Sequence, residues 1–172
     1  RRSSDCLYKC PADIYMCEMG GTKMPRVRSN SMNGFVEGGQ YDRSRSKMRG
    51  SIWYGGWRKY DHLDHITDPD PSHLWVFVDE HPDSINGGGF AVRMVESDRM
   101  HEARIIDYPA SHHNGSGTLS FADGHSAFRK WIDSRTPPPV RYNNQLQLNK
   151  NCRDNPDMLW LAERTSSRMP GF

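Results

Sequence analysis

The sequence lacks any long hydrophobic run. Its longest uninterrupted apolar stretch extends only from Leu74 to Val78, whereas a helix that spans a membrane needs roughly 18 or more apolar residues. The chain also opens without the basic and apolar segments of a signal peptide. We therefore expect no segment of the chain as written to cross a membrane.

The sequence also lacks a strong excess of charge. Its 23 basic and 21 acidic residues give a formal net charge of +2, and they are interspersed apart from a short basic run at Arg43–Arg49. A nucleic-acid-binding protein usually carries a continuous basic surface. We therefore expect no nucleic-acid partner.

Aliphatic side chains are scarce, and no internal repeat is present. A chain of 172 residues is nevertheless long enough to bury a core, and five Trp, seven Tyr, six Phe and nine Met residues can supply much of it. The 15 glycines, 11 prolines and mean hydropathy of −0.86 indicate many surface loops. We expect one loop-rich domain over residues 1–172 and no all-helical bundle.

The cysteines do not follow the common motifs. Cys6, Cys10, Cys17 and Cys152 include no Cys-x-x-Cys pair, which excludes the usual zinc-knuckle, thioredoxin and haem-attachment spacings. An even number of cysteines suits one or two disulfides in an exported protein, and unpaired thiols in a cytosolic protein are the alternative. Three connectivities are open. We favour one bridge between the N-terminal group and Cys152, which would contribute about 4 kcal/mol by closing a long loop.

Two apolar segments predict neighbouring strands. Leu74–Val78 is rich in β-branched and aromatic residues and is bounded by turn residues, so we expect it to be the central strand. Phe90–Met94 follows an acidic, glycine-rich loop and is predicted to return as its partner.

A hairpin is predicted over Thr118–Trp131. Asp123-Gly124 lies between two strand-like runs, and this dipeptide favours a two-residue turn. The register set by such a turn would place Leu119, Phe121 and Phe128 on one apolar face.

A short helix is predicted near the C-terminus. Asn155 is a favourable capping residue, Pro156 suits the first helical position, and Asp157 suits the positive end of the helix dipole. Taken together, these elements predict an α+β domain. It would contain a small antiparallel sheet of four to six strands, long glycine-rich loops and the short C-terminal helix.

Three groups of polar residues are candidate sites. His62, His65 and Asp68 could bind a transition metal for a hydrolase, although a solvated acidic loop explains them more simply. Hard oxygen ligands for calcium occur after the central strand, without the spacing of an EF-hand, at Asp79, Glu80, Asp83 and Asn86.

The third group comprises His112, His113, Asp123 and His125. General acid–base catalysis there would need a nucleophile or a metal beside the imidazole and carboxylate. No serine nearby lies in a nucleophile motif, so we expect no catalysis and no enzyme.

The same region resembles a known family. His113, nine further residues and then Asp123-Gly124 are similar to the H-X9-DG signature of the prepilin-type, processing-associated proteins, a group that includes pilin-like and type II secretion pseudopilin-like proteins. Further elements of this resemblance, in order from about Cys10 to Thr165, are Cys10-Pro-Ala-Asp13, Ser31–Gly34, Phe77–Glu80, Phe121–His125 and Asn155–Asp157.

The resemblance implies a location and a role. It implies a pilin-like or pseudopilin-like head domain outside the cytoplasm of a bacterium, at the cell surface or in the periplasm. The family's hydrophobic, methylated N-terminal helix is missing from the chain as written. The implied function is that of a structural subunit in a pilus-like or pseudopilus-like filament. Its partners would be copies of itself or other pilin-like subunits, and it would contact a membrane only through the missing helix.

The alternative function is a secreted carbohydrate-binding or adhesive module. It would use the acidic loop for calcium and would stack glycans on aromatic side chains interleaved with glycine, although packing in the core also explains these residues. They are Trp53, Tyr54, Trp57 and Tyr60. A metal-dependent hydrolase is the third possibility.

Overall fold

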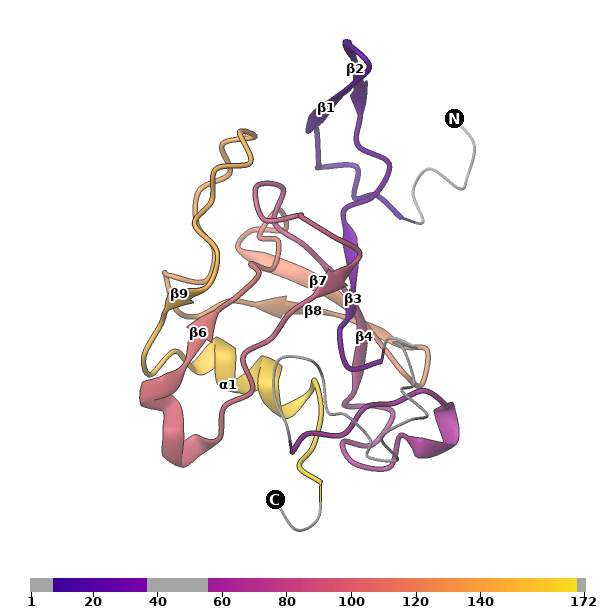
Figure 1. Ribbon diagram of the computed structural model, residues 1–172, viewed down its shortest axis with the longest axis vertical. Coiled ribbons are helices and arrows are strands. Elements are labelled where there is room, and N and C mark those ends of the chain that lie inside the picture. The colour runs from indigo at the N-terminus through magenta and orange to yellow at the C-terminus, as the bar shows by residue number, and fades with distance from the viewer. Residues whose placement is uncertain (1–7, 37–55, 170–172) are drawn as a thin grey trace, which may run out of the picture.

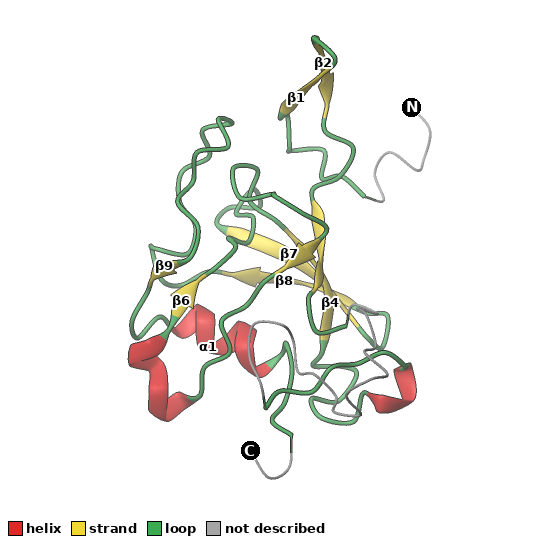
Figure 2. Cartoon of the chain, viewed as in Figure 1, coloured by secondary structure: helices red, strands yellow, loops and turns green. Residues whose placement is uncertain are grey.

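The computed structural model describes residues 8–36 and 56–169. More of these residues lie in strands than in helices, and the helices lie below the main sheet in the view of Figures 1 and 2. The strands are β1 (Met16–Met19), β2 (Thr22–Pro25), β3 (Asn30–Asn33), β4 (Trp75–Asp79), β5 (Gly89–Phe90), β6 (Arg104–Ile105), β7 (Ser116–Phe121), β8 (Ser126–Lys130) and β9 (Lys150–Asn151). The helices are α1 (Pro156–Glu163) and two 3₁₀ segments, Leu63–His65 and Ser97–Glu102.

The main sheet has five strands in the order β5-β3-β4-β7-β8. β4 occupies its centre, which confirms the strand predicted at Leu74–Val78 and shifts both of its ends by one residue. Two further sheets have two strands each, β1-β2 and β6-β9.

The predicted α+β class is wrong, because the described chain is mostly β with a single short α-helix. The predicted antiparallel sheet is also wrong, because β5 pairs with β3 in parallel. The predicted strand Phe90–Met94 shrinks to Gly89–Phe90, which lies beside β3 at the sheet edge and not beside β4. The fold therefore does not match the pilin-like head expected from the resemblance.

The hairpin between β7 and β8 forms, but its register differs by one residue from the prediction. Leu119 lies opposite Ala127 and Thr118 lies opposite Phe128. A three-residue loop replaces the two-residue turn, since the backbone N–H of Phe121 donates to the carbonyl of His125 at 2.9 Å. A shift of one residue moves a side chain to the other face of a sheet, so Phe128 is 69% exposed whereas Leu119 is fully buried.

The main core lies between one face of the sheet and α1. Val78 and Leu119 from the sheet belong to the same buried cluster as Met158, Leu161 and Ala162 from α1. This packing gives the short helix the tertiary support that an isolated helix of this length would lack.

The predicted cap of α1 is confirmed. The side-chain oxygen of Asn155 accepts hydrogen bonds from the backbone N–H groups of Asp157 and Met158 at 2.9 and 3.3 Å, and Pro156 begins the helix. Asp157 is fully buried and accepts hydrogen bonds from the backbone of Ile132 and Asp133. The start of α1 is thereby tied to the segment that follows β8. Within residues 8–36 and 56–169, every helix is too short or too polar to span a membrane.

Candidate functional site

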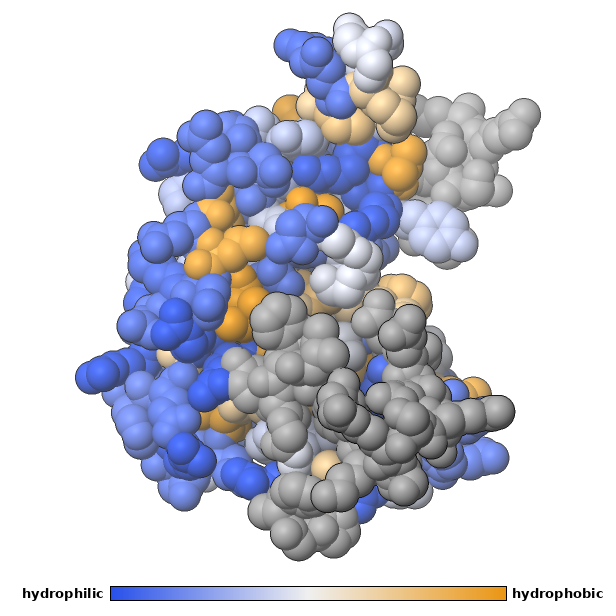
Figure 3. Space-filling model, in the orientation of Figure 1, coloured by the Kyte–Doolittle hydropathy of each residue, from blue (hydrophilic) through white to orange (hydrophobic). Residues whose placement is uncertain are grey.

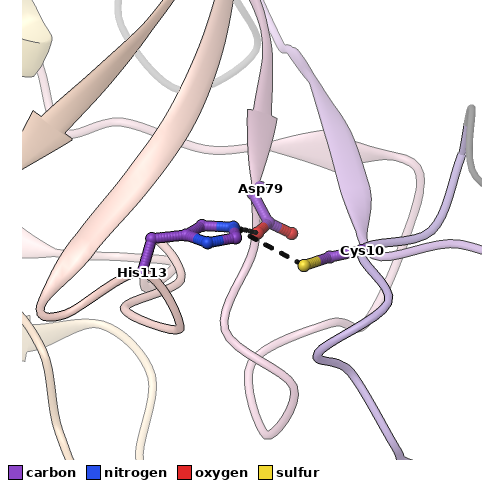
Figure 4. A group of neighbouring side chains, drawn as sticks. All are labelled: Cys10, Asp79 and His113. Atoms are coloured by element: carbon purple, nitrogen blue, oxygen red, sulfur yellow. Dashed lines mark hydrogen bonds and ion pairs between the residues drawn. The ribbon is translucent and has the colours of Figure 1, made fainter.

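Three side chains from distant parts of the chain meet beside the C-terminal end of β4. The Sγ atom of Cys10 lies 3.6 Å from Nε2 of His113, and the same nitrogen lies 4.0 Å from Oδ2 of Asp79. One potential ligand atom from each residue lies within 4.8 Å of the other two, and Figure 4 shows the three side chains pointing toward one another. Among the described residues, this is the one group of three or more His, Cys, Asp or Glu side chains that close together. We call it the Cys10–Asp79–His113 cluster.

Each member is positioned by backbone hydrogen bonds. The N–H of Cys10 donates to the hydroxyl of Ser29 at 2.6 Å, just before β3. Asp79 is the last residue of β4, and its carbonyl accepts from the N–H of Ala110 at 2.7 Å. His113 exchanges two backbone hydrogen bonds with Ser116, at 3.1 and 3.3 Å, in the turn before β7. The cluster therefore joins the N-terminal segment, the central strand and the loop before β7.

The carboxylate of Asp79 is the most unusual group in the cluster. The residue is only 3% exposed, and neither carboxylate oxygen has a hydrogen-bond partner of regular geometry. Burial raises the pKa of Asp79, although the nearby Ser29 hydroxyl and the imidazoles of His112 and His113 act in the opposite direction. Burial also raises the pKa of the Cys10 thiol.

The geometry favours ligation over nucleophilic catalysis. In a Cys-His-Asp catalytic arrangement, the thiol faces one imidazole nitrogen and the carboxylate orients the ring through the other. Here the thiol and the carboxylate both face Nε2 of His113. The three side chains converge on one point and do not form a relay.

The chain after Cys10 leads into a hairpin formed by β1 and β2. The carboxylate of Asp13 is buried at the foot of this hairpin, where it accepts from the N–H of Tyr15 at 2.9 Å and pairs with Arg26 at 3.8 Å. The guanidinium of Arg26 lies 4.1 Å from the centre of the Tyr15 ring and donates to the carbonyl of Pro82 at 2.8 Å. These contacts fix the foot of the hairpin to the body of the domain.

The hairpin itself projects beyond the sheet (Figure 1). In Figure 3 this end of the molecule presents hydrophobic residues, in beige and orange, beside hydrophilic ones. Apolar side chains on and next to the hairpin are largely exposed: Ile14 at 67%, Met16 at 49%, Met19 at 66%, Met24 at 37% and Val27 at 83%.

The sequence analysis missed this hairpin, although a signal for it exists. Gly20-Gly21 separates the two strands, and a Gly-Gly pair between strand-like runs favours a two-residue turn with positive φ. The structure has Met19 opposite Thr22, and φ is 59° at Gly20 and 77° at Gly21.

The four predicted calcium ligands have different partners. Asp79 belongs to the cluster above, and Glu80 is buried, where it accepts from the hydroxyls of Ser31 and Ser84. Burial raises the pKa of Glu80 to about 8. The carboxylate of Asp83 accepts four backbone N–H groups from residues 141–144, and the amide of Asn86 donates to Asp107 at 3.4 Å. The structure therefore does not gather these four side chains into a calcium site.

The residues considered for a metal hydrolase do not form a site either. The imidazole of His65 pairs with Asp61 at 2.8 Å on the surface, and its ring packs edge-on against His62. Asp68 is exposed, and its carbonyl accepts hydrogen bonds from the hydroxyls of Tyr60 and Ser167.

The H-X9-DG residues lie at opposite ends of one strand. His113 precedes β7, whereas Asp123 and Gly124 form the loop that follows it. The carboxylate of Asp123 accepts from the backbone N–H of His125 at 3.0 Å and pairs with its imidazole at 2.6 Å. The spacing of the motif thus corresponds to the length of β7 and its flanking turns, and His113 has its partners elsewhere.

The predicted disulfide to Cys152 is not formed. Cys10, Cys17 and Cys152 are free, and Cys6 lies outside the described residues. The thiol of Cys152 is buried beside the amide of Asn155, 2.9 Å away. Cys17 lies on the hairpin, where its thiol donates to the carbonyl of Met24 at 3.4 Å.

The aromatic residues considered for glycan stacking include two that the structure describes. Tyr60 is 2% exposed and belongs to a buried cluster with Ile66 and Leu74. Trp57 is half-buried against the main core, and the guanidinium of Arg168 lies 5.3 Å from the centre of its ring. Trp53 and Tyr54 lie outside the described residues.

Comparisons of the chain with models of known protein families, with curated proteins and with solved structures gave no match. The site and the surface of this chain are therefore the basis for the functional argument.

Proposed function

We propose that the chain is the extracellular head of a structural subunit in a pilus-like or pseudopilus-like bacterial filament. We further propose that the β1–β2 hairpin contacts a neighbouring subunit. The observation that carries this proposal is the projecting hairpin with its exposed apolar side chains. The resemblance of the sequence to H-X9-DG proteins supports the location and the type of partner.

The β1–β2 hairpin lacks the third strand or packed surface that usually stabilises a two-stranded ribbon. An isolated two-stranded ribbon is marginally stable in water and usually gains stability from a third strand or a packed surface. β1 and β2 pair only with each other in the described chain, so their outer edges are available for pairing.

The charge of the hairpin favours a protein partner. Glu18 lies opposite Lys23 in the register, so the ribbon carries balanced charges. Such a surface offers no excess of positive charge to a nucleic acid or an anionic membrane. A neighbouring subunit that covers the apolar side chains fits it better.

The test uses the organism that makes this chain. Filaments sheared from its surface are collected and probed with an antibody against the described domain. We expect the antigen in the filament fraction. We expect the double variant Met19→Asp, Val27→Asp to fold but to be lost from the filaments, because charge at both positions would have to be buried in the contact.

Leu63→Asp is the matched control. Leu63 is 74% exposed and lies on a 3₁₀ segment away from the hairpin, so this variant should assemble normally. An antigen that stays in the cytosol, or a double variant that assembles as well as the parent, would contradict the proposal.

A further inference from the structure

We propose that Cys10, Asp79 and His113 bind one zinc-like divalent metal ion, and that this ion fastens the N-terminal segment to the sheet. The inference is independent of the filament proposal, because it concerns the chemistry of the Cys10–Asp79–His113 cluster alone.

The distances between the donor atoms suit a small metal ion. For tetrahedral zinc, Zn–S bonds of ~2.3 Å and Zn–N or Zn–O bonds of ~2.0–2.1 Å place donor atoms about 3.4–3.6 Å apart. The distance from Sγ of Cys10 to Nε2 of His113 is 3.6 Å. Oδ2 of Asp79 lies 4.0 Å from that nitrogen, so a small side-chain rotation would complete the set.

The second observation is that neither buried carboxylate oxygen of Asp79 has a regular hydrogen bond. A buried polar group normally has a hydrogen-bond partner, and a buried charge needs a counter-charge or a metal. Asp79 is 3% exposed, both of its oxygens lack a regular hydrogen bond, and the carboxylate points into the cluster. A divalent cation would supply the missing partner.

The types of donor select the metal. Calcium and magnesium prefer sets made only of oxygen ligands, whereas a thiolate, an imidazole and a carboxylate together suit zinc and similar ions. The side chain of His113 is 38% exposed, so a further coordination position would face solvent and could hold water. When the ion binds, the thiol of Cys10 loses its proton and the thiolate becomes a ligand.

The three ligands come from three separate parts of the chain: the segment before β1, the end of β4 and the turn before β7. Cys10 and His113 are 103 residues apart in the sequence. A metal ion at this point would cross-link the N-terminal segment to the central strand and to the loop before β7, a role that the described cysteines, all free, do not fill with a disulfide.

The first experiment is a titration of the metal-stripped chain with Zn²⁺ alone. A phosphine reductant that does not chelate zinc keeps the thiols reduced, and a chromophoric chelator competes for the ion. We expect one Zn²⁺ per chain. Substitution with Co²⁺ should give a thiolate-to-cobalt charge-transfer band that Cys10→Ser abolishes.

The variants separate ligands from structural residues. Cys10→Ser, Asp79→Asn and His113→Gln should each weaken Zn²⁺ binding more than about 100-fold, since loss of residues that merely support a ligand already costs 10–100-fold. Cys17→Ser, Asp123→Asn and His125→Gln alter the same residue types elsewhere and should bind Zn²⁺ as the parent does.

The melting temperature of Asp79→Asn distinguishes a metal ligand from a residue that only supports the fold. This variant removes the charge of a buried carboxylate whose oxygens lack a regular hydrogen bond, so the metal-free protein should melt at the same temperature or higher. The increase in melting temperature that Zn²⁺ gives the parent should disappear. Absence of stoichiometric Zn²⁺ binding by the parent, or undiminished binding by Cys10→Ser, would overturn the proposal.

Discussion

The side chain of Asp83 holds the loop of residues 141–144 in place. It accepts backbone hydrogen bonds from Arg141, Tyr142, Asn143 and Asn144 at 2.6–3.1 Å. Burial acts to raise the pKa of Asp83, but these four amides outweigh it and hold the pKa below its ordinary value. The hydroxyl of Tyr142 in turn donates to the carbonyl of Ala12 at 3.4 Å, so the loop supports the segment below the hairpin.

We predict that Asp83→Ala lowers the free energy of unfolding by roughly 2–4 kcal/mol at pH 7, because several amides lose a charged acceptor. A lowered folded-state pKa means that this stabilisation is present above the ordinary Asp pKa of ~3.9 and is lost as the pH falls through the folded-state value. The free energies of unfolding of parent and variant, measured by urea denaturation, should therefore differ less at pH 3 than at pH 7.

Asp61→Ala is the control for Asp83→Ala. The carboxylate of Asp61 is on the surface and pairs with the imidazole of His65, so its loss should leave the free energy of unfolding nearly unchanged. If Asp83→Ala lowers the free energy of unfolding by the same amount at pH 3 and pH 7, the charge of the carboxylate is not the source of the stabilisation.

The residues of the cluster could be identified from the sequence, but their association could not. The sequence indicates Cys10 as a disulfide candidate, Asp79 as a calcium ligand and His113 as part of a motif. Each interpretation rests on neighbours in the sequence. The actual neighbours depend on how β4 and the turn before β7 lie in space, and local spacing carries no information about that arrangement.

The loop between β7 and β8 sets the register of that hairpin. Gly124 has φ of 93°, and no heavy atom lies within 4 Å of the position that a Cβ atom would take. We predict that Gly124→Ala lowers the free energy of unfolding by about 1–2 kcal/mol, because an L-residue in this conformation is strained even where space is available. Chemical denaturation measures the loss.

Gly87→Ala is the matched control for Gly124→Ala. A methyl group at residue 87 would likewise meet no heavy atom within 4 Å, and φ there lies outside the left-handed region, so the change should stay within about 0.5 kcal/mol. Equal effects of the two substitutions would show that backbone conformation at residue 124 is not limiting.

Elements with strong local signals were predicted best. The apolar run at β4 and the Asn155-Pro156 start of α1 lie where the sequence indicated. The register of β7 and β8 was wrong because Asp123-Gly124 is compatible with both a two-residue and a three-residue loop. The parallel pairing of β5 with β3 could not be predicted, since it joins residues about 57 positions apart and depends on the path of the intervening chain.

At the scale of the whole molecule, the absence of disulfides at the three described cysteines has a measurable consequence. We predict that a phosphine reductant leaves the melting temperature unchanged within about 1 °C. Loss of a disulfide would remove 2–5 kcal/mol and would lower the melting temperature by several degrees. Such a decrease in a calorimetric scan would show that a disulfide forms in solution, and Cys152→Ser would then identify whether Cys152 takes part.

The buried side chain of Asn33 connects three distant parts of the chain. Its amide donates to the carbonyls of Trp75 and Thr165 at 2.9 and 3.1 Å, and its oxygen accepts from the N–H of Phe35 at 3.0 Å. It thereby joins β3 to the central strand and to the residues that follow α1. A hydrophobic residue of similar size could not make any of these bonds.

We predict that Asn33→Ala lowers the free energy of unfolding by about 3 kcal/mol, because buried backbone groups lose their partners. This is a large share of the roughly 5–15 kcal/mol by which a typical domain is stable. Gln145→Ala, at an exposed loop position, should be neutral. Because α1 also packs against the sheet through its buried apolar side chains, the variant should still unfold in one transition, with far-ultraviolet circular dichroism and tryptophan fluorescence changing together. If the helical signal of the variant is lost first, Asn33 is the main attachment of α1 to the sheet, and the apolar contacts of α1 do not hold it there on their own.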